Sequence, residues 1–540
     1  MFLLSVPETW QAVVPRLVAA SVISFLLAWL VHLVRPAFAS GVWPRYGGYS
    51  WPKGKRGLWQ YYSLAYECVS QPDKVFKPAY AKDTAWKQLC NAANQMVLMP
   101  LPHSPQGFLF LLPVELLDEF TRQPDKVVSL HAYTREVMHP KYTTFGENFV
   151  DNSIHYPVVY RELGQKLVSQ THKINDETVF AIKDILTSQL DKNGELSINM
   201  WETSLKLLTQ VSNRAVIGLP LCRNQEFLDA NRVYSDNMFS VGLIIRLIPS
   251  FLRPLLAPIA QRPLLRAREI VANHALPVIK ERMRILDEAE NSGKTPNLPS
   301  DLLTATMKIA RNHTDAHLEY TPLNLVHRVM GYNFLQTWTQ ALTLTNAIFD
   351  LISLPQDLFE ETVADIRAEI TAGLEKSSGA WTHELLETLQ VTDAFLRESM
   401  RWNPIGEVGI ERTITAKYGF TFSNGLHAPR GATLAAPNRS IQRDRRHYPG
   451  GFNPKRALHD PTRPRATTVS REFLNFGLGR PACPGRWFAV DVMKLVIGHL
   501  LMEYDFERVD ERPQNVRKLT IYEPSTRVDI VLRKRVEGLL

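Results

Sequence analysis

Apolar residues recur at intervals of three and four positions through most of residues 110–410, and this spacing predicts α-helices. The clearest stretches are 157–191, 199–217, 262–287, 321–353 and 385–402. Four prolines interrupt the pattern at 249–263, so this segment is predicted to be a loop or a short broken helix. Between Pro404 and Pro454 the pattern changes to short β-type runs, and the turn residues Ser423-Asn424-Gly425 predict a hairpin. We therefore expect a mainly α fold, with a large helical body and a small β-rich subdomain.

An apolar stretch without formal charge runs from Leu17 to Val34. As a helix it would be roughly 27 Å long, which nearly spans a bilayer core. More basic residues follow the stretch than precede it, and this bias predicts a transmembrane anchor with the rest of the chain on the cytosolic side. A cleaved signal peptide and a buried helix are the alternatives. We expect an anchor at residues 1–36, a linker at 37–56 and one large domain at 57–540.

The composition is that of a globular protein, because 45% of the 540 residues are hydrophobic and 21% are charged. The four cysteines lie far apart without a C-x-x-C pair, which argues against a disulfide framework or a zinc site and favours a reducing compartment. A net charge of +8 suits nucleic acid, an anionic membrane or an acidic protein partner. The basic residues are scattered among acidic ones and form no arm, so we do not expect nucleic acid as a partner.

The strongest local signal is the segment FLNFGLGRPACPGRWFAVD, residues 473–491, in which glycines and prolines crowd around Cys483. Glycines let backbone N–H groups approach a sulfur closely and allow positive φ. An apolar-periodic run begins just after the cysteine, and a helix there would add its positive dipole end. Both effects favour a thiolate over a thiol. A buried structural cysteine is the alternative.

This segment resembles the haem-binding loop of the cytochromes P450, F-x-x-G-x-x-x-C-x-G, with Phe476, Gly479, Cys483 and Gly485 in place. The resemblance implies a haem b cofactor, Cys483 as its proximal iron ligand and catalytic residue, and Phe476, Gly479 and Gly485 as cofactor-binding residues. A thiolate opposite the oxygen site would favour O–O cleavage.

The loop departs from the family pattern at one position. Two residues before the cysteine the family usually has Arg or His, which helps to hold a haem propionate, whereas this chain has Pro481. Arg480, next to it, is a candidate replacement. Arg412, in GIERTIT, resembles the family's propionate-binding arginine, and Arg161, in HYPVVYRE, is a second candidate. A solvated surface arginine is the alternative for both.

Glu398 and Arg401 are three residues apart and would share one face of a helix. Taken alone, such a pair usually lies on the surface. In the family this E-x-x-R motif precedes an F-x-P-x-R segment whose arginine completes a buried triad, and residues 452–456 supply Arg456. The block NRAVIGLPLCRN, residues 213–224, is similar to a stretch common in fungal secondary-metabolism members. The resemblance covers nearly everything after about residue 45 and points to a microsomal member of that type.

The family's long central helix carries [AG]-G-x-[DEH]-T, which leaves room for O2 and relays protons. Here the motif aligns with residues 335–339: Thr339 keeps the alcohol and is the predicted catalytic residue, Gln336 replaces the glycine, and Trp338 replaces the acid. An indole N–H donates but cannot accept a proton. Protons could instead pass through water, Gln336 or a substrate hydroxyl. Unusual chemistry such as desaturation, rearrangement or radical coupling, or a shifted register, would also explain the change.

The resemblance implies a monooxygenase that oxidises a hydrophobic small molecule, a fungal secondary-metabolite intermediate, with O2 and electrons from NADPH. NADPH-cytochrome P450 reductase would be the partner, because the chain shows no flavin or dinucleotide-binding segment. The protein is expected in the endoplasmic reticulum membrane as a single-pass protein in contact with lipid, its catalytic domain cytosolic. Two other classes stay open: an enzyme with atypical chemistry, including an isomerase or dehydratase that needs no reductase, and a non-catalytic haem-binding protein.

Overall fold

The computed structural model describes residues 49–50, 63, 65–68, 70–81, 96–101, 108–187, 190–191 and 194–535. The predicted anchor at 1–36 and most of the predicted linker lie outside these residues. Within the described ranges, no helix combines the length and the apolar character needed to cross a bilayer.

Helices predominate, and the short strands lie in a few groups between them. The helices are α3 (Pro72–Ala81), α5 (Leu117–Arg122), α6 (Leu130–Met138), α7 (Pro140–Thr143), α8 (Asn148–Asp151), α9 (His155–Tyr160), α10 (Leu167–Thr187), α11 (Met200–Val216), α12 (Gln225–Leu247), α13 (Arg253–Ala260), α14 (Arg262–Ser292), α15 (Leu302–Arg311), α16 (Ala316–Glu319), α17 (Pro322–Ile352), α18 (Gln356–Lys376), α19 (His383–Thr388), α20 (Gln390–Trp402), α21 (Asn438–Gln442), α22 (Arg456–His459) and α23 (Arg486–Glu503). The strands are β1 (Tyr49–Ser50), β2 (Met96–Pro100), β3 (Phe108–Leu111), β4 (Val128–Ser129), β5 (Glu195–Asn199), β6 (Gly409–Ile414), β7 (Phe420–Thr421), β8 (His427–Ala428), β9 (Thr433–Ala436), β10 (Tyr504–Phe506), β11 (Val516–Lys518), β12 (Ile521–Glu523) and β13 (Asp529–Lys534). The prediction of a mainly helical fold with a small β region is confirmed.

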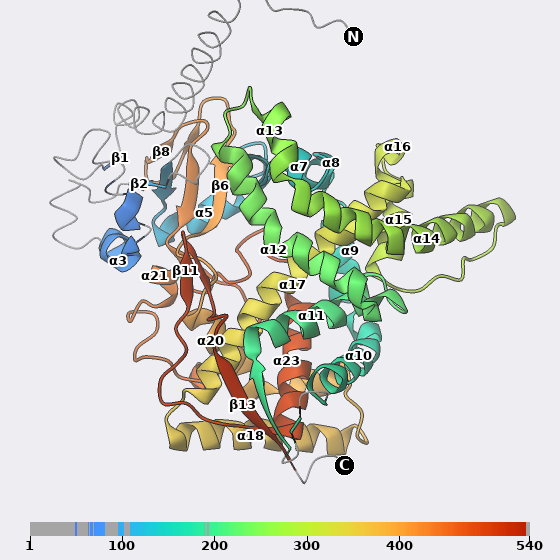
Figure 1. The fold of residues 1–540 in the computed structure, drawn as a ribbon. Helices are drawn as coiled ribbons and strands as arrows, with labels where there is room; N and C mark the ends of the chain where they lie inside the picture. The colour runs from blue at the N-terminus through green and yellow to red at the C-terminus, as the bar shows by residue number, and fades with distance from the viewer. Residues whose placement is uncertain are drawn as a thin grey trace, which may run out of the picture.

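Helix α17 runs through the middle of the helical body and contacts α11, α12, α14 and α20 (Figure 1). It begins at Pro322 after Thr321, whose side chain accepts a hydrogen bond from the Asn324 N–H. A capping threonine followed by proline is a favourable start for a helix. Apolar residues occur on most sides of α17, as expected of a helix that is enclosed by others.

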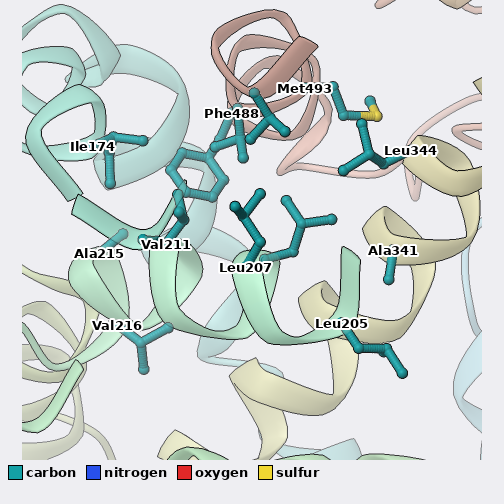
Figure 2. Packing of buried hydrophobic residues seen from close by; sticks show 14 of the residues in the cluster. Ile174, Leu205, Leu207, Val211, Ala215, Val216, Ala341, Leu344, Phe488 and Met493 are labelled. Atoms are coloured by element: carbon teal, nitrogen blue, oxygen red, sulfur yellow. The ribbon is translucent and has the colours of Figure 1, made fainter. Parts of the chain in front are cut away.

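The core beside α17 is formed by side chains from four helices. Figure 2 shows Leu207 and Val211 of α11 close to Phe488 of α23, with Leu344 of α17 near Met493. Each of these side chains is almost fully buried, which stabilises the fold by about 1.5–3 kcal/mol per residue. This packing fixes α17 relative to α23, and these two helices bear most directly on the site.

The main sheet has the strand order β1-β2-β3-β9-β6-β4 and lies to one side of the helical body (Figure 1). Tyr49 and Ser50, from the expected linker, form β1 and pair with β2. Strand β6 carries Arg412 and pairs antiparallel with β9. Strands β7 and β8 form the predicted hairpin, with Gly425 at φ +85° in its turn. The proline-rich segment 249–263 contains the short helix α13, as predicted.

The predicted helix at 157–191 is divided in the structure. Between α9 and α10 lies a π-helical turn, Arg161–Gln165, where the Lys166 N–H donates to the Arg161 carbonyl, five residues back, at 3.0 Å. Such a turn inserts one residue and rotates the apolar face. Apolar spacing alone cannot reveal it, because both parts keep the same period.

The stretch 385–402 is also divided, at Leu389, where the backbone leaves the helical conformation. The Glu369 carboxylate of α18 accepts hydrogen bonds from the N–H groups of Val391 and Thr392, both at 2.8 Å. This contact caps the start of α20 from another helix. A residue twenty positions away thus sets the boundary, which local patterning could not predict.

Candidate haem-thiolate site

A cavity of about 400 Å³ lies between α17 and the loop that carries Cys483. Its walls come from α9, α17, α20, α23 and residues 475–485. Four of the predicted site residues line it: Thr339, Phe476, Cys483 and Gly485. Residues far apart in the sequence therefore meet around one space, as the site prediction requires.

The cysteine loop folds back on itself around two glycines. Gly477 and Gly479 have φ of +77° and +75°, and the Cys483 N–H donates to the Phe476 carbonyl at 2.7 Å. Burial raises the pKa of the Cys483 thiol, whereas the N–H groups of Gly485 and Arg486 and the charge of Arg486 lower it. These N–H groups stand at the start of α23, so the helix end helps to hold negative charge on the sulfur.

Gly479 should be less replaceable than Gly425, which also has a positive φ. A left-handed backbone costs an L-residue about 1–2 kcal/mol. At Gly479 an added Cβ would also lie 2.8 Å from the Cβ and the carbonyl oxygen of Thr121, whereas at Gly425 it would meet nothing within 4 Å. In urea unfolding, we expect Gly425→Ala to lower the free energy of unfolding only by this backbone cost. Gly479→Ala should lower it clearly more and should also reduce the amount of bound haem. Equal losses would show that the Thr121 contact has no influence.

The cavity face of α17 is polar. Gln336, Thr339, Gln340 and Thr343 follow one another at helical spacing and all line the cavity. The Thr339 hydroxyl donates to the carbonyls of Leu335 and Gln336, at 3.1 and 3.3 Å. Its proton is therefore directed at the backbone of its own helix, and its oxygen remains able to accept.

Trp338 does not line this cavity. Its indole packs against the hydrophobic core, with the ring of Phe239 on α12 at 6.2 Å between centroids in an edge-on arrangement. The residue that aligns with the family's acid thus faces α12, and Gln336 rather than Trp338 lies at the cavity wall.

Glu398 lies between Arg401 and Arg456, as the sequence motifs predict. Both Glu398 oxygens accept from Arg401 at 2.7 Å, and Arg456 Nε donates to them at 3.2 and 3.1 Å. The Asn453 N–H adds a further bond to Glu398 at 2.8 Å. The cluster joins α20 to the start of α22 and to the segment before it. A buried ion cluster of this kind fixes one geometry more than it adds stability.

The three candidate propionate arginines differ in place. Arg412 is buried, and its guanidinium donates to the carbonyls of Thr121 and Leu478 at 3.3 and 3.2 Å. Among the described residues no carboxylate forms an ion pair with it, and burial lowers its pKa to about 10. None of the three arginines is among the residues that line the cavity, and Arg161 and Arg480 are exposed.

Sequence reasoning overlooked His155 and Tyr156 of α9, which line the cavity although their segment was considered only for Arg161. His155 stacks on Phe149 at 4.8 Å, and burial lowers its pKa to about 3, so the ring is neutral. Its Nδ1 is buried without a hydrogen-bond partner in the described part of the chain. A helical wheel of 155–160 would have placed His155 and Val159 on one face.

These residues fit a haem. Cys483 offers a soft sulfur ligand whose negative charge is stabilised by backbone N–H groups. Arg412 has no acid partner among the described residues. At the cavity wall, the Nδ1 atom of His155 lacks a hydrogen-bond partner in the described part of the chain. Elsewhere in the described ranges, no group of three or more His, Cys, Asp or Glu residues could hold a metal ion. Cys483 is thus the metal-binding candidate to which the geometry points.

Comparison with known proteins shows which family this chain resembles. A sequence model of the family described as cytochrome P450 matches residues 161–530. Cytochrome P450 monooxygenase gloP of Glarea lozoyensis is 27% identical over 471 residues, covering 82% of this chain and 84% of the relative. Cytochrome P450 monooxygenase paxP of Penicillium paxilli is 29% identical over 441 residues, covering 80% and 82%. The solved structure of retinoic acid-bound cyanobacterial CYP120A1 shares the fold, with a TM-score of 0.62 and 16% identity over 87% of this chain and 96% of that one.

The fold and site define a haem-containing oxidoreductase. The chain belongs to the cytochrome P450 family and is a monooxygenase of that family. The family works with a redox partner and acts on hydrophobic substrates.

Proposed function

We propose that the chain is a haem b monooxygenase that oxidises a hydrophobic intermediate of fungal secondary metabolism. The observation that carries the proposal is the single cavity lined by both Cys483 and Thr339. When bound there, the haem supplies the activation of O2. In this account residues 57–540 form the oxygenase domain, 1–36 the anchor and 37–56 the linker.

The chain's own residues would hold the cofactor. Cys483 would bind the iron, with Phe476, Gly479 and Gly485 shaping its loop, and Arg412 would pair with a propionate. The apolar part of the wall suits the flat porphyrin ring and is formed by Val159, Leu163, Ile405, Phe488 and Met493. Thr339 lies on the α17 side, where its hydroxyl oxygen can accept a hydrogen bond from water.

The partner for electron supply would be NADPH-cytochrome P450 reductase. Arg161 and Arg480 are exposed near the cysteine loop, and neither forms an ion pair with another described residue. Arg486 lies over the Trp487 ring at 3.6 Å beside them. Unpaired positive charge next to the thiolate loop favours an acidic partner, because complementary charge steers docking.

Contact with membrane lipid is supported by exposed apolar side chains at the end of α12 and on α13. Phe251 and Leu255 are 65% and 70% exposed, and Ile244, Leu247 and Ile259 are also exposed. Several exposed apolar groups in one region are typical of an interaction surface. With the predicted anchor, this supports the endoplasmic reticulum membrane as the location, with the catalytic domain in the cytosol.

The reaction is tested with the full chain in lipid, reductase, NADPH and 18O2. The substrate would be the compound that accumulates when the gene is deleted. We expect a product containing one atom of 18O, formed only when reductase and NADPH are present. Turnover without NADPH would indicate an isomerase or dehydratase, and a product without 18O would indicate desaturation, rearrangement or coupling. Failure of every accumulated compound to be converted, with or without NADPH, would favour a non-catalytic haem protein.

The anchor is tested by deleting residues 1–36. The shortened chain should leave the membrane after carbonate washing while its haem content is unchanged, because no predicted cofactor residue lies in the deleted segment. The full chain should stay in the membrane fraction under the same treatment. Carbonate-resistant attachment of the shortened chain would contradict the assignment of the anchor.

A further inference from the structure

Gln336 has an unusual position on α17. The side chain lines the cavity that also contains Cys483, yet neither its amide nitrogen nor its amide oxygen has a hydrogen-bond partner in the described part of the chain. Both atoms are buried. A buried polar group without a partner costs about 1–3 kcal/mol. A carboxamide held in this state beside a cofactor cavity indicates a partner that enters the cavity.

Neighbouring polar groups are mostly engaged within the protein. Thr339 donates to the backbone, Thr343 donates to the Thr339 carbonyl at 2.9 Å, and the Tyr332 hydroxyl pairs with Thr306 at 2.7 Å. Asn403 donates to Asp350 at 2.6 Å. These groups cannot serve as donors into the cavity without breaking a bond that the fold already makes.

Two other cavity-lining side chains also have atoms without partners. Gln340 lacks a partner for its amide oxygen, which can only accept. His155 lacks one for Nδ1, but it lies on α9, a different wall from Thr339. Gln336 lies three residues before Thr339, and both its amide nitrogen and its amide oxygen are buried without a partner among the described residues.

Trp338 cannot fill this role, because its ring packs against Phe239. We therefore propose that Gln336 is the positioning residue on the α17 side of the haem, which holds water and a bound diatomic molecule through its carboxamide. The amide neither gains nor loses a proton: its N–H groups donate to the bound molecule, and its oxygen accepts from water that brings protons from solvent. This inference rests on the proposed haem-thiolate function.

The test uses the full-length holoenzyme without substrate and carbon monoxide as the diatomic probe. A donor near the bound molecule lowers the C–O stretching frequency, which infrared or resonance Raman spectroscopy measures. Gln336→Leu should raise that frequency and increase the peroxide formed per NADPH. Gln336→Met, of similar length, should also raise the frequency because a thioether has no N–H to donate.

The matched control is Thr337→Val. Thr337 is the next residue of the same helix, is buried with an unpaired hydroxyl, and does not line the cavity. Its variant should leave the C–O frequency unchanged. An unchanged frequency in both Gln336 variants, or an equal shift in Thr337→Val, would overturn the inference. If the unchanged protein lacked the thiolate-type spectrum, the proposed function itself would be overturned. Failure of the inference about Gln336 can therefore be distinguished from failure of the proposed function.

Discussion

Replacing Cys483 with alanine should reduce NADPH-dependent product formation to the background rate. Alanine offers the iron no electron pair, and the N–H groups of Gly485 and Arg486 would then face a methyl group instead of a sulfur. The electron push from a thiolate that favours O–O cleavage is lost. Product per enzyme, measured with reductase and saturating NADPH, reports the change.

Cys222 provides the matched control for this substitution. It is also a free cysteine, but it is fully buried and lies in the short turn Leu221–Arg223, away from the cavity. Cys222→Ala should retain product formation, with at most a modest loss of stability. Equal inactivation by the two substitutions would show that general damage to the fold, and not the iron ligand, explains the result at Cys483.

Replacing Glu398 with alanine should have the largest effect on stability. Arg401 is 2% exposed, and the substitution would leave it and Arg456 without their shared acid. Breaking a buried ion cluster by removing one partner costs about 3–5 kcal/mol. We expect urea unfolding to show a loss of this size and the purified protein to contain much less haem.

A surface carboxylate close to this cluster gives the comparison. Glu361 is 58% exposed and pairs with Lys455, the residue before Arg456. Glu361→Ala should cost about 1 kcal/mol or less, since exposed pairs add little. If Glu398→Ala were as mild as Glu361→Ala, the triad would have no special role in the fold.

The sequence could predict features that depend on local spacing. Apolar periodicity identified α11, α14 and α17 because each buries a face at regular intervals. The contact of Glu398 with Arg456, 58 residues away, was within reach only because the family resemblance paired two short motifs. The division of the helix at Leu389 could not be predicted from the sequence, because it depends on the Glu369 carboxylate of α18.

The site shows the same limit. A helical wheel places Gln336, Thr339, Gln340 and Thr343 on one face and separates Trp338 from them, so the polar cavity face could have been predicted. The contact of Trp338 with Phe239 could not, because it depends on how α12 packs on α17. The sequence also could not predict that the Gln336 carboxamide lacks hydrogen-bond partners, because this depends on the tertiary contacts of the neighbouring polar groups.

The proposed function depends above all on Cys483, which would supply a thiolate to a haem in the cavity. The most direct measurement is the absorption spectrum of the reduced, carbon monoxide-treated full-length protein beside its Cys483→Ala variant. We expect the red-shifted Soret band of a thiolate-ligated haem in the parent and in Cys222→Ala, and its absence in Cys483→Ala. A parent without that band, or a Cys483→Ala variant that retains it, would contradict the account.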